Sequence, residues 1–265
     1  MDIEFLLGHA IASACSGVSK KQVIRFLEEH NAEKAEIPML IKSMAFKEEP
    51  DVIDYEYLYN RPIPNGSVNH SPLGSRTKLY SLDNFLTPKE CKDLIELIEQ
   101  EKRRSTVADP DDSGLIGNYR TSSTASLLQL KHPVINDVNN KLRNLLDLDL
   151  FLGEAIQGQK YKPGEYYKEH NDYFHPGTAE LKTYTEWMGQ RTWTTMIYLN
   201  DVEEGGETYF KHLNCKFKPK EGTVVFWCNL YRNGRVNPKT LHEALPPIKG
   251  DKYIITKWWR SWPLI

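Results

Sequence analysis

The stretch RTWTTMIYLNDVEEGGETYFKHLNCKFKPKEGTVVFWC, residues 191–228, decides the fold class of this 265-residue chain. It alternates runs of β-branched and aromatic residues with turn signals, namely the glycine pair at 205–206 and the proline and glycine at 219–222. This spacing predicts short strands at 191–199, 207–210 and 223–228, because Gly and Pro interrupt strands whereas β-branched and aromatic residues favour them. Several short strands with regular turns indicate a sandwich or a barrel.

The same pattern continues outward on both sides. Similar runs predict strands at 78–85, 154–161, 241–244 and 253–260. One helix is predicted after Thr87, where Pro88 suits the first helical position and Glu90 completes a capping box, and a second helix is predicted at 133–146. The expected fold class is therefore α+β, with helices packed outside a β-rich core.

The chain before this core has a different character. Apolar residues in 2–44 recur at helical spacing, and residues 48–76 collect prolines and glycines that are typical of a linker. We therefore predict a helical N-terminal extension with its linker at 1–72 and a main domain at 73–265. The extension is a candidate element for homodimerisation or for presenting a substrate, or a packing element alone.

Composition and charge exclude several classes of function. The 34 Lys and Arg residues nearly balance the 36 Asp and Glu residues, so the chain has no general attraction for nucleic acid or an anionic membrane. No apolar run approaches the ~20 residues of a membrane span. The four cysteines lack zinc-site spacing and are too few for a disulfide scaffold, and the first residues are acidic where an export signal is basic. We expect a cytoplasmic protein without nucleic-acid or membrane partners.

The stretch YKPGEYYKEHND, residues 161–172, is the strongest candidate for a functional site. His170 and Asp172 are two positions apart, so in an extended segment both side chains point to the same side. His242, in a predicted strand, is the candidate third ligand, whereas His175 is expected to point away. Two His and one carboxylate with open positions are the facial triad of non-haem Fe(II) oxygenases. A hydrogen-bonded His–Asp pair in a loop is the alternative.

Lys252 is a second candidate. It lies ten residues after His242, beyond the turn signal at 249–250. Adjacent antiparallel strands joined by such a turn can place both side chains in the same barrel mouth. A lysine inside a barrel is costly unless it meets an anion, so this position would suit an anionic ligand. A solvated lysine at a strand edge is the alternative.

Taken in order, these motifs closely resemble the prolyl 4-hydroxylase family of Fe(II)/2-oxoglutarate-dependent dioxygenases. The resemblance covers residues 76–262. It rests on the segments 161–172, 189–191, 196–208, 222–227 and 242–258 and extends back to 82–97 and 120–123. It implies a jelly-roll core, that is, a double-stranded β-helix. It also implies Fe(II), the cosubstrate 2-oxoglutarate and O2, with ascorbate as a candidate reductant.

Position by position, the resemblance also implies roles for individual residues. His170, Asp172 and His242 match the iron ligands, and Lys252 matches the lysine that pairs with the distal C5 carboxylate of 2-oxoglutarate. The remaining matches lie around these groups. They are Thr194 at the same carboxylate, Tyr161 and Tyr167 lining the cosubstrate pocket, Trp258 beside the iron and Arg191 at the substrate groove.

The activity that the resemblance implies is hydroxylation of a prolyl or similar residue in a peptide or protein, with succinate and CO2 as coproducts. Asp172 favours hydroxylation, since related halogenases lack this carboxylate. Arg260 stands where many members carry histidine, and together with Arg191 it could clamp a free carboxylate. A free amino acid or another small carboxylate is therefore the rival substrate class. A non-enzymatic metal-binding β-barrel module is the third interpretation.

Overall fold

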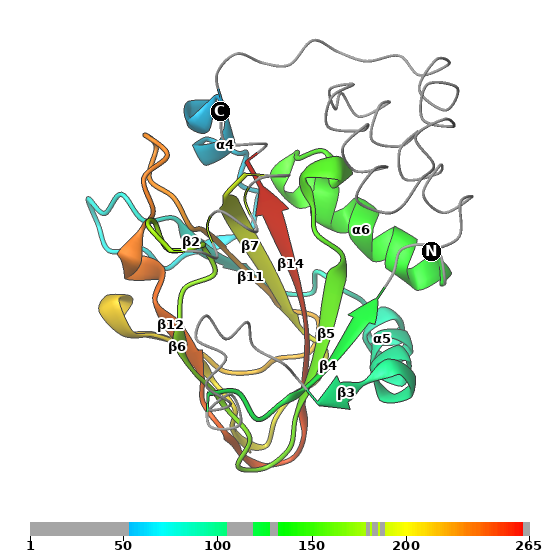
Figure 1. The fold of residues 1–265 in the computed structure, drawn as a ribbon. Coiled ribbons are helices and arrows are strands. Elements are labelled where there is room, and N and C mark those ends of the chain that lie inside the picture. Colours follow the sequence, from blue (N-terminus) through cyan, green and yellow to red (C-terminus); the bar gives the residue numbers. More distant parts are fainter. Residues whose placement is uncertain are drawn as a thin grey trace, which may run out of the picture. The chain divides into compact units, whose positions relative to one another are not determined.

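The computed structural model describes residues 53–104, 119–127, 132–178, 181, 185 and 189–261 (Figure 1). The predicted helices within residues 1–52 and much of the loop before residue 189 lie outside these residues. Within the described part of the chain, no helix has the length and apolar character needed to cross a bilayer. Residues 54–72 belong to the same compact unit as the β core. The domain boundary at residue 72 stays a prediction.

Two antiparallel sheets form the core (Figure 1). The larger sheet has the strand order β1 (Val68–Asn69), β2 (Leu79–Leu82), β11 (Val224–Cys228), β7 (Arg191–Tyr198), β14 (Lys252–Arg260), β5 (Ile156–Tyr161), β4 (Ser123–Leu127), β3 (Arg103–Arg104). The smaller sheet has the order β10 (Cys215–Phe217), β9 (Thr208–Phe210), β12 (His242–Ala244), β6 (Tyr167–His170). A third pair joins β13 (Pro247–Lys249) to β8 (Glu204–Gly205). This arrangement confirms the predicted jelly-roll core.

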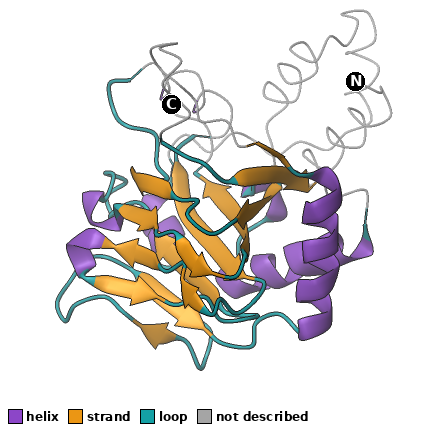
Figure 2. Cartoon of the chain, turned by 90° about the horizontal axis from the view of Figure 1, so that it is seen from below, coloured by secondary structure: helices purple, strands orange, loops and turns teal. Residues whose placement is uncertain are grey.

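Two long helices, α5 (Pro88–Glu101) and α6 (Pro133–Leu146), lie together on one side of the strands (Figure 2). Helix α5 contacts β4 and β5, and α6 contacts α5. The predicted capping box is present, since the Thr87 hydroxyl accepts from the backbone N–H of Glu90 and the Glu90 carboxylate accepts from that of Thr87. A Cβ on Gly158 would lie 2.4 Å from Ile98 Cγ1, so this glycine lets α5 approach β5 closely.

Buried side chains from both sheets fill the space between them. The members of this cluster are Leu79, Tyr161, Met196, Tyr198, Phe210, Phe217, Val225, Trp227, Ala244 and Ile254. Because β9, β10 and β12 contribute from the smaller sheet, the cluster joins the two sheets face to face. The candidate site lies at this junction, where β6 and β12 end beside the large sheet.

Sequence patterns located most of these elements. Both predicted helices of the main domain are confirmed. The predicted strands are confirmed with shorter ends, most of all 78–85, which is reduced to β2, except that β14 begins one residue before the predicted 253–260. The remaining elements are short and were not predicted as such. They are α4 (Tyr55–Tyr59), the 3-10 turns η2 (Leu150–Leu152), η3 (Lys211–Leu213) and η4 (Pro238–Thr240), and strands β1, β3, β4, β6, β8, β10 and β13.

Candidate metal and cosubstrate site

Backbone pairing in the small sheet brings two of the three predicted metal ligands together. His170 is the last residue of β6 and lies directly opposite His242, the first residue of β12. Asp172 follows two residues after His170, where the strand has ended. One ligand atom from each of these three residues lies within 4.8 Å of the others. This set of two imidazoles and one carboxylate has the composition of a facial triad.

Both imidazoles are held in the orientation that a metal requires. The Nδ1 of His170 donates to the carbonyl of Lys168 at 2.8 Å, and the Nδ1 of His242 donates to that of Thr240 at 2.9 Å. Each Nε2 therefore keeps its lone pair and faces Asp172, at 3.7 Å from His170 and 4.0 Å from His242. Burial lowers the pKa of His170 to about 3, which keeps the ring in the neutral form that binds metals.

The carboxylate of Asp172 is fixed by a short chain of hydrogen bonds. Thr194 Oγ1 donates to Asp172 Oδ2 at 2.8 Å, and Asn229 Nδ2 donates to Thr194 Oγ1 at 2.9 Å. Burial acts to raise the pKa of Asp172, but His242, His170 and Arg191 outweigh this effect and lower it below its usual value. Asp172 is therefore ionised and oriented before any ligand arrives, as expected of a metal ligand whose carboxylate is held by hydrogen bonds from neighbouring side chains.

Aromatic rings enclose the imidazoles. Tyr167 stacks on His170 with the ring centroids 3.7 Å apart, and Phe210 stacks on His242 at 5.1 Å. Trp227 meets His242 edge-on at 4.9 Å. These contacts restrict rotation of both imidazoles and shield one side of the site from water.

Lys252 is the clearest sign that the site receives an anion. It begins β14 opposite Tyr161 on β5, and its side chain is fully buried. Its Nζ lies over the rings of Tyr161 and Tyr198 at 5.1 and 5.5 Å, and no described group lies within hydrogen-bonding distance. Burial lowers the pKa of Lys252 to about 7, against an opposing effect of Glu207. A buried ammonium without a partner is costly, so this position fits the distal carboxylate of 2-oxoglutarate.

A second buried cation, Arg120, lies over the ring of Tyr167. Its guanidinium carbon is 4.8 Å from the centre of the Tyr167 ring, and its Nε donates to Ser122 at 2.9 Å. The backbone of Arg120 forms an isolated bridge with Tyr167, which fixes this contact. The sequence analysis matched the segment at 120–123 to the family but gave Arg120 no role. The sequence feature that could have singled out Arg120 is its position in a stretch with few other charges.

Glu154, which the sequence analysis did not single out, binds both arginines of the predicted carboxylate clamp. It accepts from Nε and Nη2 of Arg191 at 2.7 and 2.8 Å and from Nη1 of Arg260 at 2.8 Å. The Arg191 guanidinium also lies 4.1 Å from the centre of the Trp258 ring and donates to the backbone carbonyl of Asp172. Both arginines thus bind a carboxylate of the protein itself, which corrects the expectation that they clamp a free carboxylate.

The predicted site residues therefore fall into two groups. His170, Asp172 and His242 meet at one point, Tyr167 stacks on His170, and Tyr161 pairs with Lys252 across β5 and β14. Arg191 and Trp258 stack on each other, and Arg191 and Thr194 both hydrogen-bond to Asp172. The roles of these residues in turnover stay predictions. As expected, His175 is exposed.

Comparisons with known proteins point the same way. A family model described as the 2OG-Fe(II) oxygenase superfamily matches residues 156–260. The chain is 30% identical over 220 residues to prolyl 4-hydroxylase 2 of Arabidopsis thaliana, which covers 74% of this chain and 72% of that protein. It is 30% identical over 198 residues to prolyl 4-hydroxylase subunit alpha-1 of Gallus gallus, covering 73% of this chain and 37% of the chicken subunit. The chain thus spans little more than a third of that subunit.

Solved structures show the same fold. The 2OG complex of the viral collagen prolyl hydroxylase vCPH from Paramecium Bursaria Chlorella virus-1 matches with a TM-score of 0.54 and 31% identity, covering 69% of this chain and 96% of that one. A prolyl hydroxylase from Trichoplax adhaerens matches with a TM-score of 0.55 over 78% of this chain and 90% of that one, at 16% identity, which speaks for the fold alone. With the triad geometry and the sequence identities together, the chain belongs to the prolyl 4-hydroxylase family of 2OG-Fe(II) oxygenases.

Proposed function

We propose that this protein is an Fe(II)- and 2-oxoglutarate-dependent dioxygenase that hydroxylates a prolyl residue in a peptide or protein. The observation that carries the proposal is that the protein contains both the triad of His170, Asp172 and His242 and the buried ammonium of Lys252, which has no hydrogen-bond partner among the described residues. A structural metal site would not need that ammonium, whereas a dicarboxylate cosubstrate bound beside the metal would.

Each residue of the site has a distinct task in this reaction. The three ligands would hold the metal and leave its other positions open, and Thr194 and Asn229 keep Asp172 in place. Lys252 would bind the distal carboxylate and so fix the orientation of the cosubstrate. When bound, Fe(II) and 2-oxoglutarate supply the oxidising chemistry with O2, placing one oxygen atom in the product and the other in succinate, with loss of CO2.

Two observations favour a peptide over a free amino acid. The viral structure that resembles this chain at 31% identity is named a collagen prolyl hydroxylase. Arg191 and Arg260 share the Glu154 carboxylate, so the pair that would recognise a free carboxylate is already neutralised in part. The small-carboxylate alternative therefore has no support from the geometry.

The direct test is a turnover screen of proline-containing peptides and free amino acids. Turnover is detected as succinate release and as a mass gain of one oxygen atom in the substrate. We expect Fe(II)-dependent hydroxylation of at least one peptide whose ends are blocked. Efficient turnover of free amino acids with no reaction on any blocked peptide would overturn the substrate class. A lack of oxygen-dependent succinate formation under all conditions would overturn the enzyme assignment and favour the metal-binding module.

Two further expectations remain proposals. Cys91, Cys215 and Cys228 are free thiols in the structure, and Cys15 lies outside the described residues. Free thiols support a reducing compartment, and on this ground we propose a cytoplasmic location. Homodimerisation through residues 1–72 stays a prediction. Size measurement of the full chain and of a variant that begins at residue 53 would test it.

A further inference from the structure

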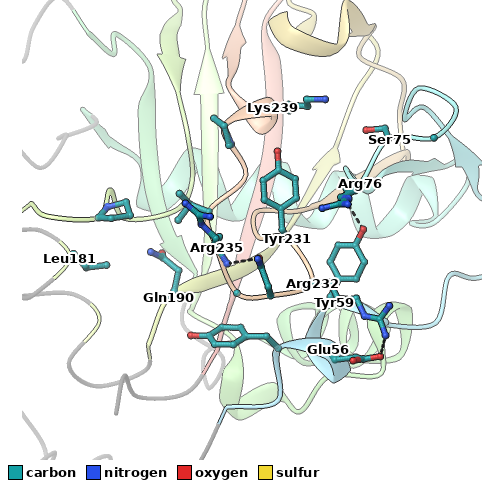
Figure 3. A pocket seen from close by; sticks show the side chains of 17 residues that line it. Glu56, Tyr59, Ser75, Arg76, Leu181, Gln190, Tyr231, Arg232, Arg235 and Lys239 are labelled. Carbon is teal, nitrogen blue, oxygen red and sulfur yellow. Dashed lines mark hydrogen bonds and ion pairs between the residues drawn. The ribbon is translucent and has the colours of Figure 1, made fainter.

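A large open cavity of about 1700 Å³ is lined by none of the predicted iron or 2-oxoglutarate residues (Figure 3). Its walls come from α4, from residues 74–76, from the hairpin at 230–236 with the following η4 turn, and from Pro176, Leu181 and Gln190. We call this cavity the basic groove, because its charged lining side chains are Arg76, Arg232, Arg235 and Lys239 against the single carboxylate of Glu56.

The charge of the basic groove is largely uncompensated. Glu56 pairs with Arg232. The structure places no carboxylate within ion-pair distance of Arg76, Arg235 or Lys239 among the residues that it describes. All three side chains are exposed to solvent. A local excess of this size contrasts with the formal net charge of −2 of the whole chain and gives the groove a field that attracts anions.

The walls that carry this charge are held in place by backbone hydrogen bonds. In the hairpin, the Tyr231 N–H donates to the Arg235 carbonyl at 2.8 Å and the Gly234 N–H donates to the Tyr231 carbonyl at 2.9 Å. Gly234 has a φ of +78°, and a Cβ there would lie 2.6 Å from the Tyr55 ring, so the hairpin rests directly on α4. A preorganised wall loses little conformational entropy when a ligand binds.

The basic groove lies within a few residues of the metal ligands. Pro176 follows Asp172 by four positions and Lys239 precedes His242 by three. A chain spans at most ~3.6 Å per residue, so these Cα atoms lie within about 14 Å and about 11 Å of their ligand residues. An extended peptide advances about 3.1 Å per residue. These limits correspond to about four and five residues of such a peptide, so a residue at the iron would place a residue about four or five positions away at the near side of the groove.

We propose that the basic groove binds acidic side chains of the polypeptide substrate, at positions about four or five residues from the hydroxylated residue. The inference rests on the proposed function and adds a sequence preference to it. Arg76, Arg235 and Lys239 meet Asp or Glu side chains, and Tyr59 and Tyr231 provide contact surface beside them. Charge at this distance acts on binding and encounter, so it changes the KM of the peptide more than kcat.

The test measures binding separately from turnover. The probes are fluorescein-labelled peptides with one central proline flanked by alternating Ala and Glu, and matched peptides with Gln in place of Glu. Fluorescence anisotropy with the full chain should show tighter binding of the Glu peptide, and Arg235→Gln/Lys239→Gln should weaken it about fivefold, as expected for loss of two exposed ion pairs. The advantage of the Glu peptide should fade as NaCl rises from about 50 to about 500 mM.

A matched control removes one Arg and one Lys elsewhere on the surface. Arg143→Gln/Lys218→Gln changes the net charge equally at exposed positions outside the groove and should leave both affinities unchanged. Equal affinity for the Glu and Gln peptides, or an equal loss in both double variants, would overturn the proposal. Displacement of the Glu peptide by an equal or lower concentration of single-stranded DNA would also overturn it, in favour of a general polyanion site. Because anisotropy requires no turnover, a failure of the hydroxylase assignment would be seen separately, as binding without succinate formation.

Discussion

His242 lies directly opposite His170 across the antiparallel pair of β12 and β6. The two ring centroids are 4.3 Å apart, and each ring is oriented by a carbonyl two residues earlier in its own chain segment. Two of the three metal ligands are therefore positioned by strand pairing, which is stiff, and only Asp172 depends on the segment after β6. Loss of one imidazole should leave the other in place. A change in metal affinity after such a substitution can therefore be attributed to the loss of one ligand.

We expect His242→Ala to abolish turnover and to weaken metal binding by more than about 10-fold, because two ligands remain where three are needed. Isothermal titration with Co(II) or anaerobic Fe(II) measures the affinity without turnover. His175→Ala is the matched control, since His175 is close to the triad in sequence but is exposed and contacts Tyr173. Unchanged metal affinity in His242→Ala would show that His242 is not a ligand.

Lys252→Ala should raise the concentration of 2-oxoglutarate needed for half-maximal rate about 10- to 1000-fold, equivalent to a charged hydrogen bond of roughly 1.5–4 kcal/mol. Metal affinity should be nearly unchanged, because Lys252 contacts the tyrosines and not the triad. A normal requirement for 2-oxoglutarate would place the carboxylate elsewhere, with Arg120 as the next candidate, since Arg260 is held by Glu154.

The lowered pKa of Lys252, about 7, predicts a pH dependence of cosubstrate binding. Below pH 7 the lysine of the free protein is already charged and binds the carboxylate directly. Above pH 7 it must first take up a proton, so affinity should fall by up to about tenfold per pH unit. Calorimetry between about pH 6 and about pH 8.5, in buffers of different ionisation enthalpy, would show this proton uptake. The Lys252→Ala variant should lose the effect.

Local signals in the sequence predicted the helices accurately. Thr87, Pro88 and Glu90 specify the start of α5 through hydrogen bonds that span three residues, and these bonds are present. The pairing of His170 with Asp172 was also predictable, since both lie within one short segment. In contrast, β1, β3 and β8 contain two residues each. Such strands exist because a partner strand is adjacent, and they carry no periodicity of their own.

Contacts between distant segments were beyond the reach of sequence patterns. Glu154 meets Arg191 and Arg260 only because β7 and β14 pair, with a register shift between Trp259 and Arg260 that sets Arg260 opposite Arg191. The sequence alone does not show this strand pairing. The two arginines are therefore interpreted from the sequence as a clamp for a ligand carboxylate, and Glu154 is interpreted as an ordinary strand residue. Thr194 is similar, because the hydrogen bond of its hydroxyl to Asp172 joins two segments that are distant in the sequence. The resemblance to a family named candidate residues but could not supply their partners in the fold.

Thr194→Val should weaken metal binding by about 10-fold, because the variant keeps the shape of the side chain but leaves one oxygen of Asp172 without its donor. Thr194→Ser retains the hydroxyl and should restore most of the affinity. The cosubstrate role implied by the family resemblance gives a different result, in which 2-oxoglutarate affinity falls while metal affinity is unchanged. Titrating metal and 2-oxoglutarate separately into both variants decides between the two roles.

Glu154→Gln should lower the free energy of unfolding near pH 7 by about 1.5–3 kcal/mol, because Arg191 and Arg260 lose the carboxylate they share. The exposed Glu101→Gln is the control and should change stability little. Burial acts to raise the pKa of Glu154, but Arg191 and Arg260 outweigh it and hold the pKa below its usual value. The carboxylate therefore stabilises the fold above its unfolded-state pKa of about 4.3, and this contribution disappears as pH falls through the lower folded-state value.

Denaturant titrations of both variants and the parent chain, at neutral and acidic pH, measure this difference directly. The gap between the parent chain and Glu154→Gln should narrow in acid, because the parent then carries a protonated Glu154. Metal affinity should also fall in this variant, since Arg191 donates to the Asp172 carbonyl and is released from one side. If stability and metal affinity are both unchanged, the two arginines do not depend on Glu154, and the carboxylate clamp for a small substrate regains its support.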